Sequence, residues 1–168
     1  MLINDIIQLS KLDEGGLQME WELVDLYELS ENVCDALHSA AEKKQVRMEI
    51  TGERCSVRGV YRILHEMVYN LCDNAIKYNR DGGSVTVQIA GTEKGISLSV
   101  ADTGIGIPYA EQSRVFERFY RVDKSHSKAV GGTGLGLSIV KHGAQIHHAS
   151  VSLESVPDAG TTVTLLFL

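Results

Sequence analysis

Five polar side chains recur at helical spacing between residues 66 and 77, namely Glu66, Asn70, Asp73, Asn74 and Lys77. An α-helix turns about 100° per residue, so these side chains share one polar wedge while apolar residues occupy the other side. A surface helix needs a polar face, which explains the charged members, but asparagine is a poor residue inside a helix. Two amide groups one turn apart could hold a hydrated Mg²⁺ with attached phosphates, because Mg²⁺ prefers oxygen ligands and shares them with substrate phosphates.

Asp102 follows directly after a predicted strand and opens the sequence Asp-Thr-Gly-Ile-Gly, which ends at Gly106. A carboxylate at a strand end can accept a hydrogen bond from an exocyclic amine, and glycine lets the backbone approach a flat ring closely. On its own, this pattern is also typical of an ordinary turn.

A second glycine-rich stretch, residues 131–136, opens a predicted helix. Backbone N–H groups and the helix dipole make such a helix start suitable for an anion. The stretch is not a Walker A loop, since no Gly-Lys-Ser/Thr follows, and it is not a dinucleotide fingerprint, since no strand precedes it closely. Taken alone, a flexible glycine hinge explains it equally well.

Together and in this order, the three features are far more specific than any one of them. Glu66–Tyr78 resembles the N box of sensor histidine kinases, and Asp102–Gly106 resembles their first glycine box. Phe116–Tyr120 resembles their F box and Gly132–Gly136 their second glycine box. The resemblance extends from about Leu17 to the C-terminus, with every box in register.

Hydrophobic periodicity predicts the elements that must position these residues. Strands are expected around 17–23, 46–50, 85–89, 96–100, 151–153 and 163–167, and helices around 26–40, 61–79 and 135–146. Asp25 with Glu28 resembles a capping box at the start of the first of these helices. We therefore expect an α/β (α+β) two-layer sandwich whose mixed, mostly antiparallel sheet is covered on one face by three helices. The resemblance implies the same architecture, the Bergerat ATP-binding fold.

The chain divides into a short N-terminal piece and one domain. Residues 1–16 carry a helical apolar stripe that stops at two glycines, and this stripe fits either a helix folded back on the domain or the end of a longer bundle. Leu9–Asp13 is similar to the end of the second dimerisation helix of the kinases, which favours the bundle. We expect residues 1–16 to end the dimerisation and phosphoacceptor bundle and residues 17–168 to form the ATP-binding catalytic domain. Residues 107–131 lack periodicity and are predicted to be its ATP lid.

The resemblance implies roles for individual residues. Asn70 would coordinate Mg²⁺, with Asn74 close to the metal and the phosphates. Lys77 would bind phosphate, and Arg121 would reach the terminal phosphates, with Arg118 as a weaker candidate. The other implied nucleotide contacts are Tyr78, Asp102, Gly104, Gly106 and Ile107 around the adenine, Gly132, Thr133, Gly134, Leu135 and Gly136 at the phosphates, and Thr162 on the last strand, where threonine is also simply common.

Glu66 has two interpretations. In related ATPases such as gyrase and the Hsp90 chaperones, a glutamate at this spacing is a general base that acts on water. In the kinases a histidine imidazole attacks, and the same glutamate orients that imidazole or a water molecule. The ending Asn74-Ala-Ile-Lys77-Tyr78 is typical of the kinases, so we favour the kinase interpretation and keep a self-sufficient ATPase as the alternative. A non-catalytic interaction module is a further alternative, although no box residue is missing.

Composition narrows the partners. The 168 residues carry a net charge of −6 without a basic run, which argues against nucleic acid or an anionic membrane as a partner. Three scattered cysteines without a Cys-x-x-Cys pair predict a reducing cytosol rather than disulfides or zinc. No apolar run approaches the length of a membrane span.

None of the six histidines fits the pattern of a phosphoacceptor, which is followed by an acidic residue and then a proline. His65-Glu66 matches only the first part, and His147-His148 are expected at the solvent edge. The resemblance therefore implies Mg·ATP as the ligand and an acceptor histidine outside this chain. It also implies two partners, the phosphoacceptor bundle of the same kinase and the receiver domain of a response regulator, and a homodimeric parent.

Overall fold

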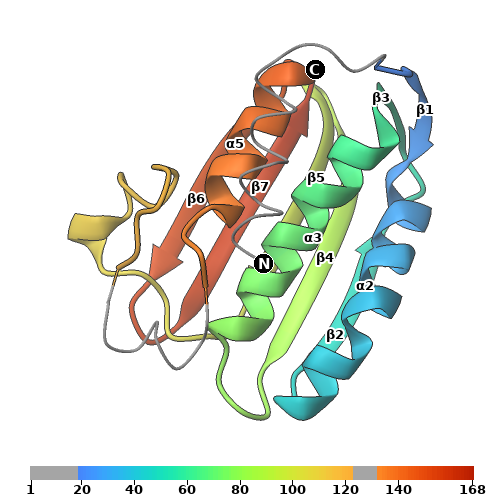
Figure 1. Ribbon diagram of the computed structural model, residues 1–168. Coiled ribbons are helices and arrows are strands. Elements are labelled where there is room, and N and C mark those ends of the chain that lie inside the picture. Colours follow the sequence, from blue (N-terminus) through green and yellow to red (C-terminus); the bar gives the residue numbers. More distant parts are fainter. Residues whose placement is uncertain (1–18, 123–131) are drawn as a thin grey trace.

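The computed structural model describes residues 19–122 and 132–168, and within them one five-stranded sheet forms the centre of the domain (Figure 1). Its strands, in spatial order, are β2 (Arg47–Gly52), β4 (Ser84–Thr92), β5 (Gly95–Asp102), β7 (Gly160–Phe167) and β6 (Ser150–Val156). The β2–β4 pair is parallel, and the other three pairs are antiparallel. The prediction of a mixed, mostly antiparallel sheet is confirmed.

Three α-helices lie side by side on one face of this sheet in the described part of the chain (Figure 1). They are α2 (Leu26–Lys43), α3 (Tyr61–Lys77) and α5 (Gly136–Ile146). Alternate strand residues such as Val87, Leu98 and Leu165 are fully buried beneath them. Each fully buried side chain of this size contributes roughly 1.5–3 kcal/mol relative to an exposed one, so the apolar stripes of the helices and the apolar side of the strands hold the two layers together. The predicted two-layer sandwich is confirmed.

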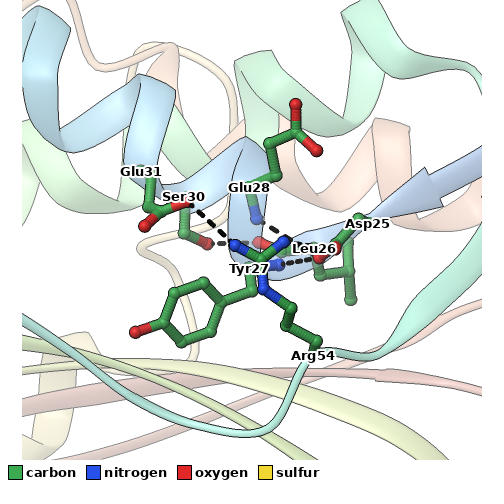
Figure 2. A network of polar contacts seen from close by, with 7 residues as sticks. All are labelled: Asp25, Leu26, Tyr27, Glu28, Ser30, Glu31 and Arg54. Carbon is green, nitrogen blue, oxygen red and sulfur yellow. Dashed lines mark hydrogen bonds and ion pairs between the residues drawn. The ribbon is translucent and has the colours of Figure 1, made fainter.

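The start of α2 is held by a network of polar contacts (Figure 2). Asp25 is the N-cap residue, and its Oδ1 accepts hydrogen bonds from the backbone N–H groups of Tyr27 (2.8 Å) and Glu28 (3.2 Å). The Arg54 guanidinium, on the loop before β3 (Ser56–Gly59), contacts Asp25 Oδ2 at 2.9 Å and Glu31 at 3.6 Å. A side chain that accepts from otherwise unpaired first-turn N–H groups stabilises a helix start. The helix start predicted at Asp25 is thus confirmed.

The first strand differs from its prediction. It is β1 (Glu22–Asp25), and it pairs with β3 in a separate two-stranded ribbon instead of joining the main sheet. The strict alternation of apolar and polar residues over 17–23 predicts that Trp21 and Leu23 lie on a buried face, but they are 39% and 75% exposed, whereas Val24 is buried opposite Val57. A two-stranded ribbon has only a small buried face, so the alternation in the sequence does not show which face of β1 is buried. The periodicity also did not predict β3, because this short strand has one buried apolar side chain, that of Val57.

His147 is not a solvent-edge residue, which corrects the sequence-based expectation. Its side chain is buried between the end of α5 and the start of α3, where the Val60 N–H donates to Nε2 at 3.0 Å and Nδ1–H donates to the Gly143 carbonyl at 2.7 Å. The Trp21 ring lies 5.2 Å from it, centroid to centroid. Burial lowers the pKa of His147, and the neighbouring His148, which is exposed, lowers it further. His147 therefore has a structural role that the sequence pattern did not suggest.

Two sequence-based expectations fall wholly or partly outside the described residues. The N-terminal piece 1–16 lies outside them entirely, and the predicted lid 107–131 is described only up to residue 122, with a short 3₁₀ helix at Tyr109–Glu111. Among the residues that are described, no helix combines the length and apolar character needed to cross a membrane.

Candidate nucleotide-binding site

The polar wedge of α3 is formed as the periodicity predicts. Glu66, Asn70 and Asn74 are half-buried on one side of the helix, while Met67 and Leu71 are buried on the other. The Asn70 amide nitrogen donates a hydrogen bond to the Glu66 carbonyl oxygen, one turn earlier, at 2.8 Å. Because this bond fixes the amide plane, the Asn70 Oδ1 oxygen is presented away from the helix backbone. An amide oxygen held in this way is a suitable ligand for a hard cation.

The glycine-rich stretch lies against this wedge. A Cβ placed on Gly136, the first residue of α5, would be 3.1 Å from Asn70 Oδ1 and 3.5 Å from the Asn74 amide nitrogen. The N-cap residue of α5 is Leu135, whose apolar side chain cannot accept from the first N–H groups of the helix. The positive end of the α5 dipole therefore faces the two asparagines, an arrangement suited to a phosphate that is shared with a metal ion.

Asp102 occupies the end of β5, as predicted, and is half-buried. Its Oδ1 accepts hydrogen bonds from the backbone N–H groups of Gly104 (2.8 Å) and Thr161 (3.3 Å). Burial raises the pKa of this carboxyl group, and the two backbone donors partly oppose the increase. Since both described donors contact Oδ1, the second oxygen is the one available to a ligand's amino group.

The loop after Asp102 is packed between the end of α3 and the end of β6. A Cβ on Gly104 would lie 2.3 Å from the Tyr78 carbonyl oxygen, which also accepts a hydrogen bond from the Ile105 N–H at 3.1 Å. Gly106 has a φ of +66°, and a Cβ there would lie 2.2 Å from the Val156 carbonyl oxygen. The Ile107 N–H donates to Ser155 Oγ at 2.8 Å. Neither glycine can be replaced without moving the backbone. Glycine is required at both positions because a neighbouring carbonyl oxygen lies where a Cβ atom would be.

The rest of the glycine stretch lies beside Tyr78 and the F box. A Cβ on Gly132 would be 3.3 Å from the Tyr78 hydroxyl. Gly134 has a φ of +76°, and its carbonyl oxygen accepts a hydrogen bond from the Phe119 N–H at 2.9 Å. Thr133 lies between these two glycines, and the side chain of Leu135 is fully buried against Ile139.

The predicted phosphate-binding cations differ in their surroundings. Lys77 Nζ forms an ion pair with Asp73 Oδ2 at 2.6 Å, one turn earlier on the same helix, and the Lys77 carbonyl oxygen accepts a hydrogen bond from Lys44 Nζ. Arg121 follows Tyr120, whose carbonyl oxygen would be 3.0 Å from a Cβ on Gly134. Arg121 is therefore the residue that follows a backbone segment lying against the glycine stretch. The side chain of Arg118 is exposed.

Thr162 is placed differently from its prediction. Successive residues of a strand point to opposite faces of a sheet, and Val163 and Leu165 point to the helix-covered face. Thr161 shares that face and lies opposite Asp102, whereas Thr162 lies opposite Ala101 and points to the other face. The strand phase set by Val163 and Leu165 already indicates from the sequence that Thr161, and not Thr162, shares the helix-covered face. Thr161 Oγ1 lies 2.8 Å from Ser155 Oγ, so it also belongs to the hydrogen-bond network that holds Ile107.

Solved structures with the same fold show the class of protein to which this architecture belongs. The mycobacterial sensor histidine kinase MprB aligns with a TM-score of 0.76 and 29% identity, over 88% of this chain and 97% of that one. Full-length ShkA, solved with AMPPNP, shares the fold with a TM-score of 0.84 at 23% identity, over 98% of this chain and 34% of that one. The architecture is that of a histidine kinase catalytic domain.

The sequence profile of the "Histidine kinase-, DNA gyrase B-, and HSP90-like ATPase" family matches residues 59–168, and the chain belongs to this family. SenX3 of Mycolicibacterium smegmatis is 39% identical over 98% of this chain and 43% of its own length. WalK of Bacillus subtilis is 33% identical over 97% of this chain and 27% of its own length. SenX3 is named a sensor-like histidine kinase and WalK a sensor histidine kinase, so within the family this chain is similar to the catalytic domains of histidine kinases. It spans less than half the length of either relative.

Proposed function

We propose that this domain binds Mg·ATP and donates the γ-phosphoryl group to a histidine of a sensor histidine kinase. The observation that carries the proposal is the contact between the start of α5 and the polar wedge of α3, where Gly136 lies against Asn70 and Asn74. It joins a set of oxygen ligands to a helix start that suits phosphate, and Asp102 supplies a base-recognising carboxylate at the neighbouring strand end.

The residues present fit Mg²⁺. Asn70 offers an amide oxygen in a fixed orientation, and the absence of a side chain on Gly136 leaves space directly in front of it. Mg²⁺ binds through one or two protein oxygens together with waters and substrate phosphates, which matches a site with few protein ligands. Asn70 would hold the ion with Asn74 beside it, and the bound ion would neutralise negative charge on the transferring phosphoryl group.

The chain's own residues would position the nucleotide. Asp102 would accept a hydrogen bond from the adenine amino group, while Gly104 and Gly106 let the backbone approach the ring. Tyr78 would pack against the adenine, and Thr161, rather than Thr162, would support the adenine from the last strand. Backbone N–H groups of residues 132–136 would bind the phosphates.

Phosphoryl transfer itself would depend on positioning and charge. The bond from the γ-phosphorus to its bridging oxygen breaks as the phosphorus–nitrogen bond to the imidazole forms, and ADP leaves. Lys77 and Arg121 would stabilise the charge on the transferring group, with Lys77 released from Asp73 or shared with it. Glu66 would orient the attacking imidazole through a hydrogen bond. The phosphoryl group would then pass to an aspartate of a response regulator in the cytosol, and the parent protein would be a homodimer.

Calorimetric titration of Mg·ATP into the chain tests the proposal, with Asn70→Ala as the site variant and Asn32→Ala, on the exposed side of α2, as the control. We expect binding at one site that Asn70→Ala weakens at least about tenfold, since removing a ligand to a charged group costs about 1.5–3 kcal/mol. Labelled phosphate should pass from ATP to a separately produced phosphoacceptor bundle of the parent kinase. Steady phosphate release that Glu66→Gln abolishes would instead identify a self-sufficient ATPase, and equal binding by both variants would refute the proposed metal site.

A further inference from the structure

Asn79, the residue after Tyr78, has a buried side chain that no part of the proposed function uses. It is 4% exposed, and each of its side-chain polar atoms is hydrogen-bonded. The amide nitrogen donates to the Ser84 carbonyl oxygen at 2.9 Å. The amide oxygen accepts from the Arg80 N–H at 2.9 Å and from the Thr103 hydroxyl at 3.3 Å. Buried polar groups of this kind are costly to leave unpaired, so this geometry is strongly held.

Thr103 completes the connection to the loop that carries Asp102. Its hydroxyl oxygen accepts from the Ser84 N–H at 2.9 Å and lies 3.5 Å from the Ser84 carbonyl oxygen, to which the Thr103 N–H donates at 3.2 Å. Asn79, Ser84 and Thr103, which we call the Asn79 clamp, therefore join the end of α3, the first residue of β4 and the loop after β5.

The clamp is closely packed. A Cβ on Gly83 would lie 2.1 Å from the Asn79 amide oxygen and 2.8 Å from the Thr103 hydroxyl oxygen. Real Cβ atoms do not approach other atoms so closely, so only a glycine at position 83 leaves room for the Asn79 and Thr103 side chains as they are placed.

Thr103 lies between the two residues whose positions decide how Asp102 presents its carboxylate. Asp102 Oδ1 is fixed by the Gly104 N–H, and Gly104 itself is packed against the Tyr78 carbonyl group. We propose that Asn79 is a positioning residue for base recognition: through Thr103 it sets the orientation of the Asp102 carboxylate, and thereby the preference for a base that carries an exocyclic amino group. This inference rests on the proposed function, in which Asp102 accepts from the adenine amino group.

Comparison of ATP with inosine triphosphate tests this role, because inosine carries a carbonyl group where adenosine carries the amino group. The ratio of the ATP affinity to the inosine triphosphate affinity, each measured with Mg²⁺ by calorimetry, reports on recognition of this edge of the base, where inosine also carries a proton on N1; the Asp102→Asn variant identifies the part of the ratio that is due to the Asp102 contact. A general loss of folding stability would weaken both nucleotides equally. We expect Asn79→Ala to lower the ratio about threefold or more, and Asp102→Asn to lower it roughly tenfold, as loss of a charge-assisted hydrogen bond implies.

Thr103 provides a second pair of variants that does not empty a buried site, since this residue is exposed. Thr103→Val removes the hydroxyl group at nearly constant volume and should lower the ratio as Asn79→Ala does. Thr103→Ser keeps the hydroxyl group and should show the same ratio as the parent. If Asp102→Asn lowers the ratio but Asn79→Ala and Thr103→Val weaken both nucleotides equally, the positioning role is wrong and the adenine contact stands. If Asp102→Asn leaves the ratio unchanged, the adenine contact itself is wrong, and the role of Asn79 falls with it.

Discussion

Gly136 and Asn70 lie on different helices, 66 positions apart in the sequence, yet a Cβ on Gly136 would be only 3.1 Å from Asn70 Oδ1. A Cβ at this distance would be closer than ordinary van der Waals contact, so the absence of a side chain on Gly136 keeps the space in front of the amide oxygen open. The amide is fixed on its other side by the bond from its nitrogen to the Glu66 carbonyl group. The oxygen therefore faces the start of α5 with little freedom to turn away.

Replacing Gly136 with alanine should separate binding from stability. The added methyl group must push the Asn70 amide by a few tenths of an ångström, and we expect Mg·ATP affinity to fall about threefold to tenfold. Folding stability should stay within about 1 kcal/mol of the parent or rise, since alanine favours a helix over glycine by about that amount. Calorimetry and urea unfolding measure the two effects. Gly91→Ala, where the added Cβ would be 3.9 Å from its nearest neighbour, is the control; an unchanged affinity in Gly136→Ala would contradict the predicted contact.

The two threonines of β7 should respond differently to the same substitution. Thr161→Val removes the hydroxyl group that contacts Ser155, which also accepts from the Ile107 N–H, so we expect a loss of about 1 kcal/mol in the free energy of unfolding and a several-fold weaker nucleotide affinity. Thr162→Val should change stability by less than about 0.5 kcal/mol, because valine suits a strand and Thr162 points to the other face. Equal effects of the two substitutions on nucleotide affinity would show that the assignment of faces is wrong.

His147 predicts how stability depends on pH. Its pKa is lowered in the folded state by burial, from an ordinary value of 6.5. Between the folded and unfolded pKa values the folded state binds fewer protons, so the free energy of unfolding rises with pH in that window. The stabilisation is present above about pH 6.5 and is lost as pH falls through the folded pKa. The same sign holds for His65, whose pKa burial also lowers.

The measurement is urea unfolding between about pH 5 and 7, where histidine titrates. His147→Gln should be less stable at the upper end and should show a flatter pH dependence than the parent. His65→Gln is the matched comparison. It should flatten the dependence of the free energy of unfolding on pH only by the part that His65 contributes, and it should leave the part due to His147 in place. A slope that His147→Gln leaves unchanged would mean that this imidazole accepts a proton as easily in the folded as in the unfolded state.

The N-cap of α2 should matter for stability and not for nucleotide binding. Asp25→Ala leaves the N–H groups of Tyr27 and Glu28 without their acceptor, and we expect a loss of about 1 kcal/mol in the free energy of unfolding. Arg54→Ala should cost less, because an ion pair between exposed side chains is screened by water and contributes little to stability. Thermal or urea unfolding checks both, and Mg·ATP affinity should be unchanged in each; restoring stability with Asp25→Asn would confirm that the cap, rather than the charge pair, is responsible.

The sequence by itself determined the three helices and most of the main sheet. The apolar residues of α2 and α3 recur every three or four positions, and those of β4, β5 and β7 alternate, because each element buries one side against the same core. The sequence also indicates three candidate site motifs, because each is local and its spacing has a direct geometric meaning. They are the asparagines of α3, Asp102 at the end of a strand, and the glycine stretch at the start of a helix.

Only the tertiary structure decided how these local motifs meet. The position of Thr161 opposite Asp102 depends on the register of β7 against β5, and the burial of His147 depends on Val60 and Trp21, which are distant in the sequence. The alternation over residues 17–23 predicted the wrong buried face for β1, because the separate ribbon of β1 and β3 buries Val24 and Val57 instead. The proximity of Gly136 to Asn70 and the Asn79 clamp likewise result from packing between elements. Periodicity records which side of an element is buried, but it carries no information on which distant partner buries it.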